Sequence, residues 1–396
     1  MSTGVTAPLG FRAAAVASGI KPDRLDLALL LADAPGPAAG VFTTNLVQAA
    51  PVVVSREHLT SGRARAVVVN AGCANAATGA GGLADAREIA GIAADTVGCR
   101  PAEVLVASTG VIGVRLPMDR VRAGIVEAGR RLSRSAGREA AEAILTTDTR
   151  PKEVAVEFPV GDRTCVVGGM AKGAGMIAPN LATMLAFFTT DAAVETSLLR
   201  RALGEAVGES LNRITVDGDT STNDCAIVLS SGARPAPPVD GEGRDFDAFR
   251  RALREAARRL AGLLVRDGEG VTRVAEVRVE GARTTEAADR IARTVADSPL
   301  VKTALHGGDP NWGRVLAAVG RSGVPLDVSR VSIWIGDVHV AEGGAARSYD
   351  EAEAAAGMRE DPVRLRIRLG EGEAVGWMWT SDLSRGYVDI NAHYRS

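Results

Sequence analysis

Two hydrophobic patterns share the 396-residue chain. Short apolar runs bounded by turn residues are typical of strands, and apolar residues at helical spacing are typical of amphipathic helices. The first pattern predicts strands at 25–31, 39–44, 50–54, 65–70, 104–108, 154–158, 164–167 and 274–280. The second predicts helices at 83–96, 138–145, 198–211, 246–264, 285–296 and 351–358. Strands and helices alternate irregularly, so we expect an α/β fold with mixed sheets layered with helices, and not a barrel repeat.

The middle of the chain, residues 168–188, changes character at Thr183. Glycines, Lys172 and a proline dominate the first half, which predicts irregular backbone, whereas the apolar run from Thr183 predicts a strand buried on both faces. A threonine at such a boundary ordinarily only packs and hydrogen-bonds locally. A sharper hypothesis makes Thr183 a nucleophile whose Oγ attacks the carbonyl carbon of Ala182. Hydrolysis of the resulting ester would free an α-amine with a pKa of about 7.7–8.0, which can act as a base near neutrality.

The pattern of apolar and polar residues changes in the last third of the chain. Clean alternation of apolar and polar residues at 331–335 and 363–369 predicts half-exposed strands. The proline-rich segment 232–241 is the clearest linker in the sequence. These features predict a smaller C-terminal lobe covering about 275–396.

Composition and charge narrow the classes of function. The chain has 46 basic and 48 acidic residues, so a net charge of −2 gives no general electrostatic reason to expect nucleic acid or an acidic membrane as a partner. No apolar run reaches the length of a membrane span, and the N-terminus has no secretory pattern, so we expect a cytoplasmic protein. Neither a G-x-G-x-x-G dinucleotide motif nor a phosphate-binding G-x-x-x-x-G-K-[ST] motif occurs in its proper context, which does not support a nucleotide cofactor.

Two loops carry residues that suit catalysis or binding. Thr109 and Gly110 follow the predicted strand 104–108, where they form either an ordinary turn or the exposed backbone donors of an oxyanion hole. Glu269 lies between glycines after a predicted helix, where we expect an exposed carboxylate. That carboxylate either belongs to a plain turn or holds an ammonium group.

The segment 215–224 contains acidic residues at alternate positions, which raises the question of a metal site. Its spacing fails the EF-hand pattern. The four cysteines and four histidines are scattered, which fits reduced thiols and no zinc site. We therefore expect no metal, and interpret 215–224 as a polar loop held by hydrogen bonds from side chains to backbone.

The sequence resembles the ornithine acetyltransferase family, whose members are also called glutamate N-acetyltransferases. The run from Met170 to Leu185, MAKGAGMIAPNLATML, is similar to the processing site of that family. Further similar segments extend the resemblance across nearly the whole chain and lie at 108–113, 146–149, 217–224, 267–270, 309–314 and 391–396. The sequence departs from the family pattern at Arg385-Gly386 and at Ser396, where many members end in threonine.

The resemblance implies self-cleavage between Ala182 and Thr183, giving an α chain of residues 1–182 and a β chain of residues 183–396 that stay associated as two copies of each. It implies that Thr183 is the nucleophile and that Thr109 and Gly110 form the oxyanion hole. The substrate-binding residues that it implies are Thr146 (with Thr147 as the close competitor), Lys172, Thr183, Glu269, Asn391 and Ser396.

The implied reaction is a ping-pong acetyl transfer through an acetyl-Thr183 ester. Acetyl moves from N-acetyl-ornithine to glutamate, which yields ornithine and N-acetyl-glutamate in the cyclic pathway of arginine biosynthesis. Acetyl-CoA is left open as a second donor, and no cofactor is expected. Two alternatives remain: an N-terminal-nucleophile amidase or aminopeptidase, which would give its acyl group to water, and a non-catalytic scaffold that keeps the fold.

Overall fold

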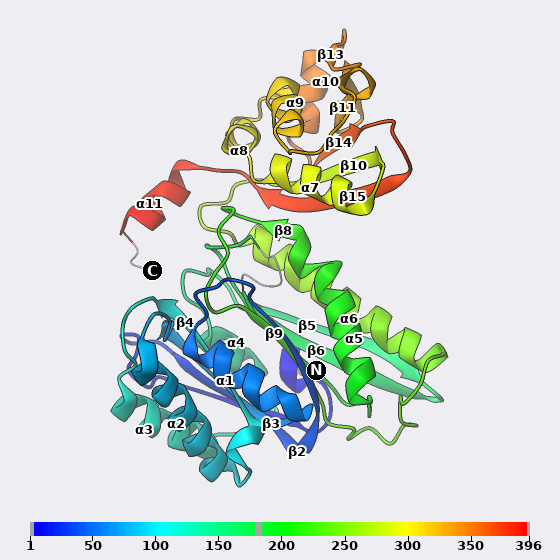
Figure 1. Cartoon of the computed structure of the whole chain (residues 1–396). Helices are drawn as coiled ribbons and strands as arrows, with labels where there is room; N and C mark the ends of the chain where they lie inside the picture. Colours follow the sequence, from blue (N-terminus) through cyan, green and yellow to red (C-terminus); the bar gives the residue numbers. More distant parts are fainter. Residues whose placement is uncertain (1–3, 179–183, 394–396) are drawn as a thin grey trace. The chain divides into compact units, whose positions relative to one another are not determined.

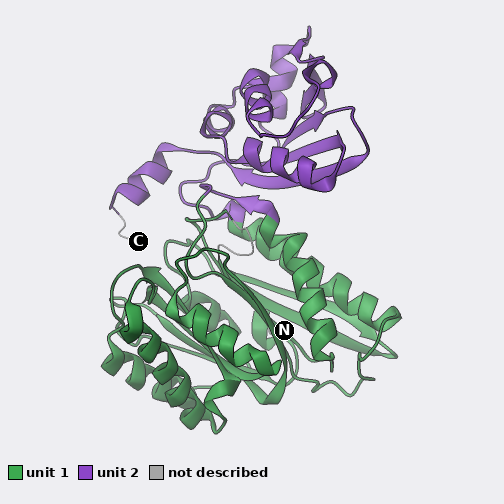
Figure 2. Cartoon of the chain, viewed as in Figure 1, with its two compact units in different colours: residues 1–212, 219–264, 396 green, residues 213–218, 265–395 purple. Residues whose placement is uncertain are grey.

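The computed structural model describes residues 4–178 and 184–393. The chain divides into two compact units, which Figure 2 shows in two colours. Unit 1 comprises the described residues of 1–212 and 219–264, and unit 2 comprises those of 213–218 and 265–395. The chain thus leaves unit 1 for a short segment, returns to it, and then completes unit 2.

Unit 1 is built on an eight-stranded mixed sheet (Figure 1). Seven of its strands follow the order β4-β3-β2-β9-β7-β6-β5, and β1 pairs with β2 beside this path. The strands are β1 (Phe11–Val16), β2 (Leu27–Phe42), β3 (Arg63–Cys73), β4 (Val104–Val111), β5 (Lys152–Val160), β6 (Arg163–Lys172), β7 (Leu185–Thr190) and β9 (Cys225–Ser230). The mixed sheet confirms the expected α/β class.

Helices cover the sheet of unit 1 and close two apolar cores. These helices are α1 (Ala50–His58), α2 (Gly79–Val97), α3 (Met118–Arg130), α4 (Gly137–Ala143), α5 (Thr196–Gly208) and α6 (Arg244–Arg266), of which the last two residues belong to unit 2. One core joins α1, α2 and α3 to strands β1 to β4, and a second joins α4 to the opposite faces of β2, β3, β7 and β9. Phe249 of α6 packs on Phe158 of β5, with ring centroids 5.7 Å apart.

The central strand β7 runs between β6 and β9. It is antiparallel to β6 and parallel to β9, with Leu185 opposite both Lys172 and Cys225. Every residue of β7 is buried, as the uninterrupted apolar run predicts. The first residues of β7 and β9 and the last residue of β6 therefore lie side by side, at the same end of these three strands.

Two local predictions were wrong. The segment 50–54 is the start of helix α1 and not a strand, because Pro51 occupies the first turn, where its missing N–H leaves no hydrogen bond unmade. Residues 168–172 are regular β6 and not irregular backbone. A Cβ at Gly168 would lie 2.2 Å from the carbonyl oxygen of Gly4, so glycine here permits close approach of two chain segments.

Unit 2 has its own seven-stranded sheet in the order β13-β12-β11-β14-β10-β15-β8. Its strands are β8 (Ile214–Thr215), β10 (Val274–Ala282), β11 (Ser332–Ile335), β12 (Val338–Glu342), β13 (Ala345–Ala346), β14 (Val363–Arg368) and β15 (Ala374–Ser381). Its helices are α7 (Thr285–Ala296), α8 (Pro299–Gly307), α9 (Trp312–Gly320), α10 (Glu351–Gly357) and α11 (Arg385–His393). The buried face of α7, with Ile291 and Val295, packs in one core with β10, β11 and β14.

Candidate active site

The end of β4 meets the end of β3 at two glycines. The parallel register places Gly72 opposite Gly110, and Gly110 has a φ of 127°, which favours glycine. A Cβ at Gly110 would lie 2.3 Å from the carbonyl carbon of Gly72, so any side chain would push the strands apart. Thr109 and Gly110 thus lie within β4, whereas the sequence predicted that the strand stops at residue 108. Pairing with β3 extends the strand to Val111.

Lys172, the last residue of β6, reaches the end of β4. Its Nζ donates a hydrogen bond to Thr109 Oγ1 over 3.1 Å. The Lys172 residue is buried, with 7% of its surface exposed. Two residues predicted for the site are therefore in direct contact within unit 1.

A buried carboxylate, Asp148, holds the loop that contains Thr146. Its Oδ2 accepts the backbone N–H of Thr146 at 3.0 Å, and its Oδ1 accepts the N–H of Gly173 at 2.6 Å and Lys152 Nζ at 2.7 Å. Burial opposes ionisation of Asp148, but the charges of Lys172 and Lys152 and these hydrogen bonds outweigh it and lower its pKa to about 2. Asp148 is therefore ionised at neutral pH and links Thr146 to the segment that follows Lys172.

Two residues of this region, Asp148 and Lys21, were not predicted from the sequence. Burial lowers the pKa of Lys21 to about 8, an effect that nearby Asp26 partly opposes. Lys21 Nζ donates to the carbonyl oxygen of Leu145 at 2.9 Å, immediately before Thr146. The only available signal for Asp148 was its place inside the Thr-Thr-Asp-Thr segment, and nothing in the sequence pointed to Lys21.

The polar loop before β9 ties the ends of the strands together. Asn223 Nδ2 donates to the carbonyl oxygens of Ala74, at 2.6 Å, and Ser108, at 2.8 Å. Thr43 Oγ1 donates to the carbonyl oxygen of Ser221 at 2.8 Å. These contacts confirm the interpretation of this segment as a loop held by bonds between side chains and backbone. They also fix the residue that precedes Thr109.

Asp224, the next residue of this loop, is a buried acid with an unmade hydrogen bond. Among the described residues, its Oδ2 has no hydrogen-bond partner. Burial raises the pKa of Asp224 well above its usual value, although hydrogen bonds to Ser221 and the charge of Lys172 act in the opposite direction. Burial thus favours the neutral form of the Asp224 carboxyl, whereas the surroundings of Asp148 favour its ionised form.

Unit 2 brings Glu269 and Asn391 together. Asn391 Nδ2 donates to Glu269 Oε2 at 2.7 Å, and Ser384 Oγ donates to the carbonyl oxygen of Gly270 at 2.6 Å. A Cβ at Gly270 would lie 2.3 Å from the backbone nitrogen of Tyr387, so this turn rests directly on the first turn of α11. The prediction that Glu269 is exposed was wrong: only 7% of its surface is accessible, because the turn is packed and bonded on α11.

Comparisons with known proteins identify the family. Residues 12–396 match the ArgJ family. The chain belongs to the ArgJ family. The arginine biosynthesis bifunctional protein ArgJ of Symbiobacterium thermophilum is 50% identical over 100% of this chain and 99% of its own length. The protein of the same name from Dehalococcoides mccartyi is 48% identical over 98% of this chain and 96% of its own length.

A solved structure of an ArgJ protein extends the comparison. The crystal structure of arginine biosynthesis bifunctional protein ArgJ from Bacillus halodurans matches this chain with a TM-score of 0.52 and 41% identity. The match covers 54% of this chain and 100% of the solved chain. The ornithine acetyltransferase resemblance drawn from the sequence is therefore confirmed at the level of the family.

Three predicted residues of this ArgJ family chain, Ala182, Thr183 and Ser396, lie outside the described residues. Within the described part, Lys172 is hydrogen-bonded to Thr109, Thr146 is hydrogen-bonded to Asp148, and the charge of Lys172 acts on Asp148. Glu269 and Asn391 are bonded to each other. Gly110 adjoins Thr109 in β4. In residues 4–178 and 184–393, no three His, Cys, Asp or Glu side chains are grouped so that they could hold a metal ion.

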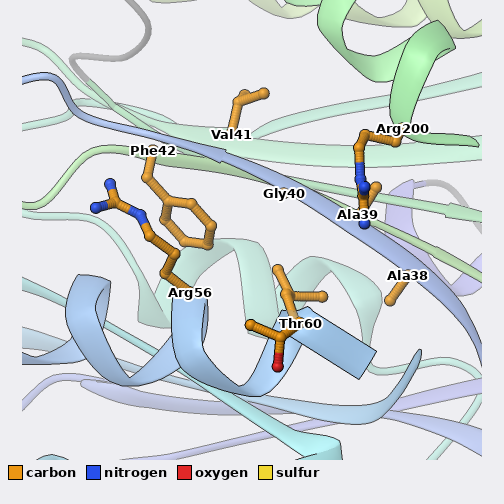
Figure 3. A pocket seen from close by; sticks show the side chains of 9 residues that line it. Ala38, Ala39, Gly40, Val41, Phe42, Arg56, Thr60 and Arg200 are labelled. Carbon is orange, nitrogen blue, oxygen red and sulfur yellow. The ribbon is translucent and has the colours of Figure 1, made fainter. Parts of the chain in front are cut away.

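A separate hollow of about 330 Å³ opens beside β2 in unit 1 (Figure 3). Arg56 and Arg200 are among the residues that line it. The guanidinium of Arg56 lies 5.5 Å from the centroid of the Phe42 ring. None of the residues predicted for the site lines this hollow.

None of the described helices is long and apolar enough to cross a membrane.

Proposed function

We propose that this chain is a self-cleaving acetyltransferase of arginine biosynthesis that moves acetyl from N-acetyl-ornithine to glutamate. The family supports this activity, since full-length relatives carry the name arginine biosynthesis bifunctional protein. The observation that carries the proposal is the 3.1 Å hydrogen bond between Lys172 and Thr109. It joins the end of the strand before the proposed cleavage point to the proposed oxyanion hole.

Self-cleavage is the first step of the proposal. Thr183 Oγ attacks the carbonyl carbon of Ala182, and hydrolysis of the ester leaves residues 1–182 and 183–396 as separate chains. The second piece would have 214 residues. The solved Bacillus halodurans chain, matched over its whole length, corresponds to 54% of this chain, or about 214 residues. A chain of that length supports cleavage near residue 183.

Acetyl transfer then proceeds in two halves. Thr183 Oγ attacks the acetyl carbonyl of N-acetyl-ornithine while its own α-amine takes the proton. Thr109 and Gly110 stabilise the oxyanion, a role that suits a strand end fixed by glycine packing and by Asn223. Ornithine leaves, and the amine of glutamate attacks the acetyl-Thr183 ester to give N-acetyl-glutamate and restore the free hydroxyl.

The remaining predicted residues bind substrate in this proposal. Lys172 meets an anionic group and Glu269 a cationic one, and Thr146, Asn391 and Ser396 add polar contacts. The bond from Asn391 suits this role, because among the described residues it engages Glu269 Oε2 and leaves Oε1 for an ammonium group. A carboxylate in a partly desolvated position binds an ammonium group more strongly than one in open water does.

The proposal also covers cofactors, a second acetyl donor, chain assembly and cellular location. We propose that no cofactor takes part and that acetyl-CoA, if it acts, is a substrate, in line with the word bifunctional in the names of the relatives. The two cleaved chains assemble as two copies of each, in the cytoplasm. The amidase alternative is not favoured, because the family is named for arginine biosynthesis.

One assay tests the proposed function. The purified chain is incubated with N-acetyl-ornithine, with and without glutamate, and N-acetyl-glutamate and acetate are quantified. The proposal expects N-acetyl-glutamate to form in step with ornithine, and acetate to stay low. Acetate release at the same rate without glutamate would instead indicate an amidase, and no turnover from an uncut chain would indicate a scaffold. A parallel incubation of glutamate with acetyl-CoA tests the second donor.

A further inference from the structure

The hollow beside β2 combines an apolar floor with positive charge. Its floor is formed by residues 38–42 of β2 and by Leu59, and two arginines complete the lining, Arg56 of α1 and Arg200 of α5 (Figure 3). No aspartate or glutamate is among the described residues that line it. Because a guanidinium forms paired, directional hydrogen bonds with phosphate and carboxylate groups, this lining suits an anionic ligand.

Neither arginine of the hollow is neutralised by a carboxylate. Arg56 Nη1 donates a hydrogen bond to the uncharged amide oxygen of Gln48 at 3.0 Å. Within the part of the chain that the structure describes, Arg200 has no hydrogen bond or ion pair. Its neighbour Arg201, by contrast, is paired with Glu242. The two exposed guanidinium groups therefore keep their hydrogen-bond donors and their charge for a ligand.

The floor of the hollow stays open because residue 40 is glycine. A Cβ at Gly40 would lie 2.7 Å from Leu59 Cδ1 and 3.0 Å from the ring of Phe42, so a side chain there would crowd two residues of the lining. The hollow can thus take an apolar group beside an anionic one. Small-molecule sites commonly have this combination of an apolar wall and a few polar groups.

One row of paired residues connects the hollow to the candidate active site. Phe42, the last residue of β2, is opposite Cys225, which is opposite Leu185, which is opposite Lys172. Three steps of about 4.8 Å between neighbouring strands make this row roughly 14 Å long. Since Lys172 is bonded to Thr109, the row runs from the hollow to the proposed oxyanion hole.

A second connection runs through a small apolar cluster. Phe42 and Ile112 both pack against this cluster, which consists of Ala49, Val52, Ala74 and Ala76. Ile112 follows Gly110 by two residues. The end of the hollow at Phe42 and the end of β4 therefore share one set of packed side chains.

We propose that the hollow binds the phosphate-bearing part of a coenzyme A thioester, an inference that rests on the proposed function. Arg56 and Arg200 bind phosphate groups, and the long flexible arm of the carrier passes Phe42 toward the strand ends. In the transfer that this donor enters, the carbon–sulfur bond of the thioester breaks. The acetyl group passes to the hydroxyl that also receives it from N-acetyl-ornithine, and the sulfur leaves as a thiol with the proton that this hydroxyl gives up.

The test measures the KM for acetyl-CoA in the complete protein, with glutamate as the acceptor. Arg56→Gln and Arg200→Gln should each raise this KM by about 10-fold, and the double variant by about 100-fold, since each removes a hydrogen bond between charged groups. Arg201→Gln is the matched control and should leave the KM unchanged, because Arg201 is paired with Glu242 and does not line the hollow. A double variant with the wild-type KM would overturn the proposal.

A shortened donor tests the contact with phosphate. S-acetyl-pantetheine carries the same thioester and no phosphate, so the wild type should use it with a higher KM than acetyl-CoA. The double variant should use it as the wild type does. An equal rise in KM for both donors in the double variant would contradict the assignment of the arginines to phosphate.

The N-acetyl-ornithine reaction separates this inference from the proposed function. Its KM should stay unchanged in the double variant, because none of the residues predicted for that substrate lines the hollow. Titration calorimetry with coenzyme A measures binding directly. A wild type that transfers acetyl from N-acetyl-ornithine but neither binds coenzyme A nor uses acetyl-CoA would overturn this inference alone. Absence of transfer from both donors would overturn the proposed function as well.

Discussion

Lys172 Nζ donates a hydrogen bond to Thr109 Oγ1 over 3.1 Å, although the two residues are 63 positions apart in the chain. The bond connects the last residue of β6 to the end of β4, on opposite arms of the unit 1 sheet. The Thr109 hydroxyl therefore has its proton free to point elsewhere, because it accepts from Lys172. A hydroxyl fixed and polarised in this way suits the stabilisation of an oxyanion.

Removal of that hydroxyl tests its catalytic role. Thr109→Ala should lower the turnover of acetyl transfer by about 10²- to 10³-fold, the usual cost of one oxyanion donor, without abolishing it. Thr109→Ser keeps the hydroxyl and should retain most of the activity. Steady-state assay of both variants after complete cleavage checks this expectation. Wild-type turnover from the alanine variant would remove Thr109 from the site.

Gly110 should tolerate no side chain. Gly110→Ala places a methyl group 2.3 Å from the backbone of Gly72 and keeps a φ of 127°, so both contact and conformation oppose it. We expect a loss of more than 2 kcal/mol of unfolding free energy, roughly the range of severe backbone strain and overpacking, and loss of activity. Denaturant unfolding measures the first effect. Gly91→Ala in α2, where a Cβ meets nothing within 4 Å, is the control and should stabilise the fold slightly.

Asn391 positions Glu269, and its loss should weaken substrate binding. Asn391→Ala removes a 2.7 Å hydrogen bond to a carboxylate, a bond worth about 1.5–3 kcal/mol. The KM for N-acetyl-ornithine should therefore rise by roughly 10- to 100-fold, with a smaller change in kcat. Asp389→Asn, an exposed change on the same helix, should leave both constants unchanged. An unaltered KM in Asn391→Ala would show that this bond does not serve binding.

The ionisation of Asp148 should make the free energy of unfolding depend on pH in the acid range. Its folded pKa of about 2 lies below its ordinary value of 3.8, so its contribution is present above pH 3.8 and is lost as the pH falls toward 2. A shift of this size corresponds to about 2 kcal/mol. Asp148→Asn removes the 2.7 Å ion pair between Asp148 and buried Lys152 and should cost about 3–5 kcal/mol at pH 7.

Urea unfolding of wild type and Asp148→Asn from pH 7 to pH 2.5 measures both effects. The difference in unfolding free energy between the two proteins should shrink as the pH falls below 3.8. Asp148→Asn combined with Lys152→Met, which removes the buried lysine charge as well, should recover much of the loss. A constant difference across this range would contradict the depressed pKa of Asp148.

Sequence patterns predicted elements well where local spacing decides them. The helix at 285–296 has the predicted bounds, because its apolar face and its capping Thr284 are both local features. The helix at 50–58 contains a valine run, which favours strands and predicts one at 50–54, but Pro51 suits the first turn of a helix. The glycines at 168 and 169 predict irregular backbone, yet they lie in a strand for a tertiary reason: neighbouring Gly4, Val154 and Phe188 leave no room for side chains.

The same distinction between local and tertiary features applies to the residues of the candidate site. Thr109, Lys172 and Glu269 could be predicted because they lie in motifs that resemble the family. Asp148 could not be predicted as the centre of a network, since its partners Lys152, Lys172 and Gly173 meet it only after β5 and β6 form their hairpin. The raised pKa of Asp224 depends on its burial, which no local pattern reveals.

The central claim is that the chain cuts itself before Thr183 to make its own nucleophile. Intact mass under denaturing conditions, measured for the wild type beside Thr183→Ala, tests it most directly. The account predicts two wild-type species that end at Ala182 and begin at Thr183, and one full-length species for the variant. A wild-type chain that remains whole while it transfers acetyl, or a Thr183→Ala chain that is cut at the same bond, would contradict it.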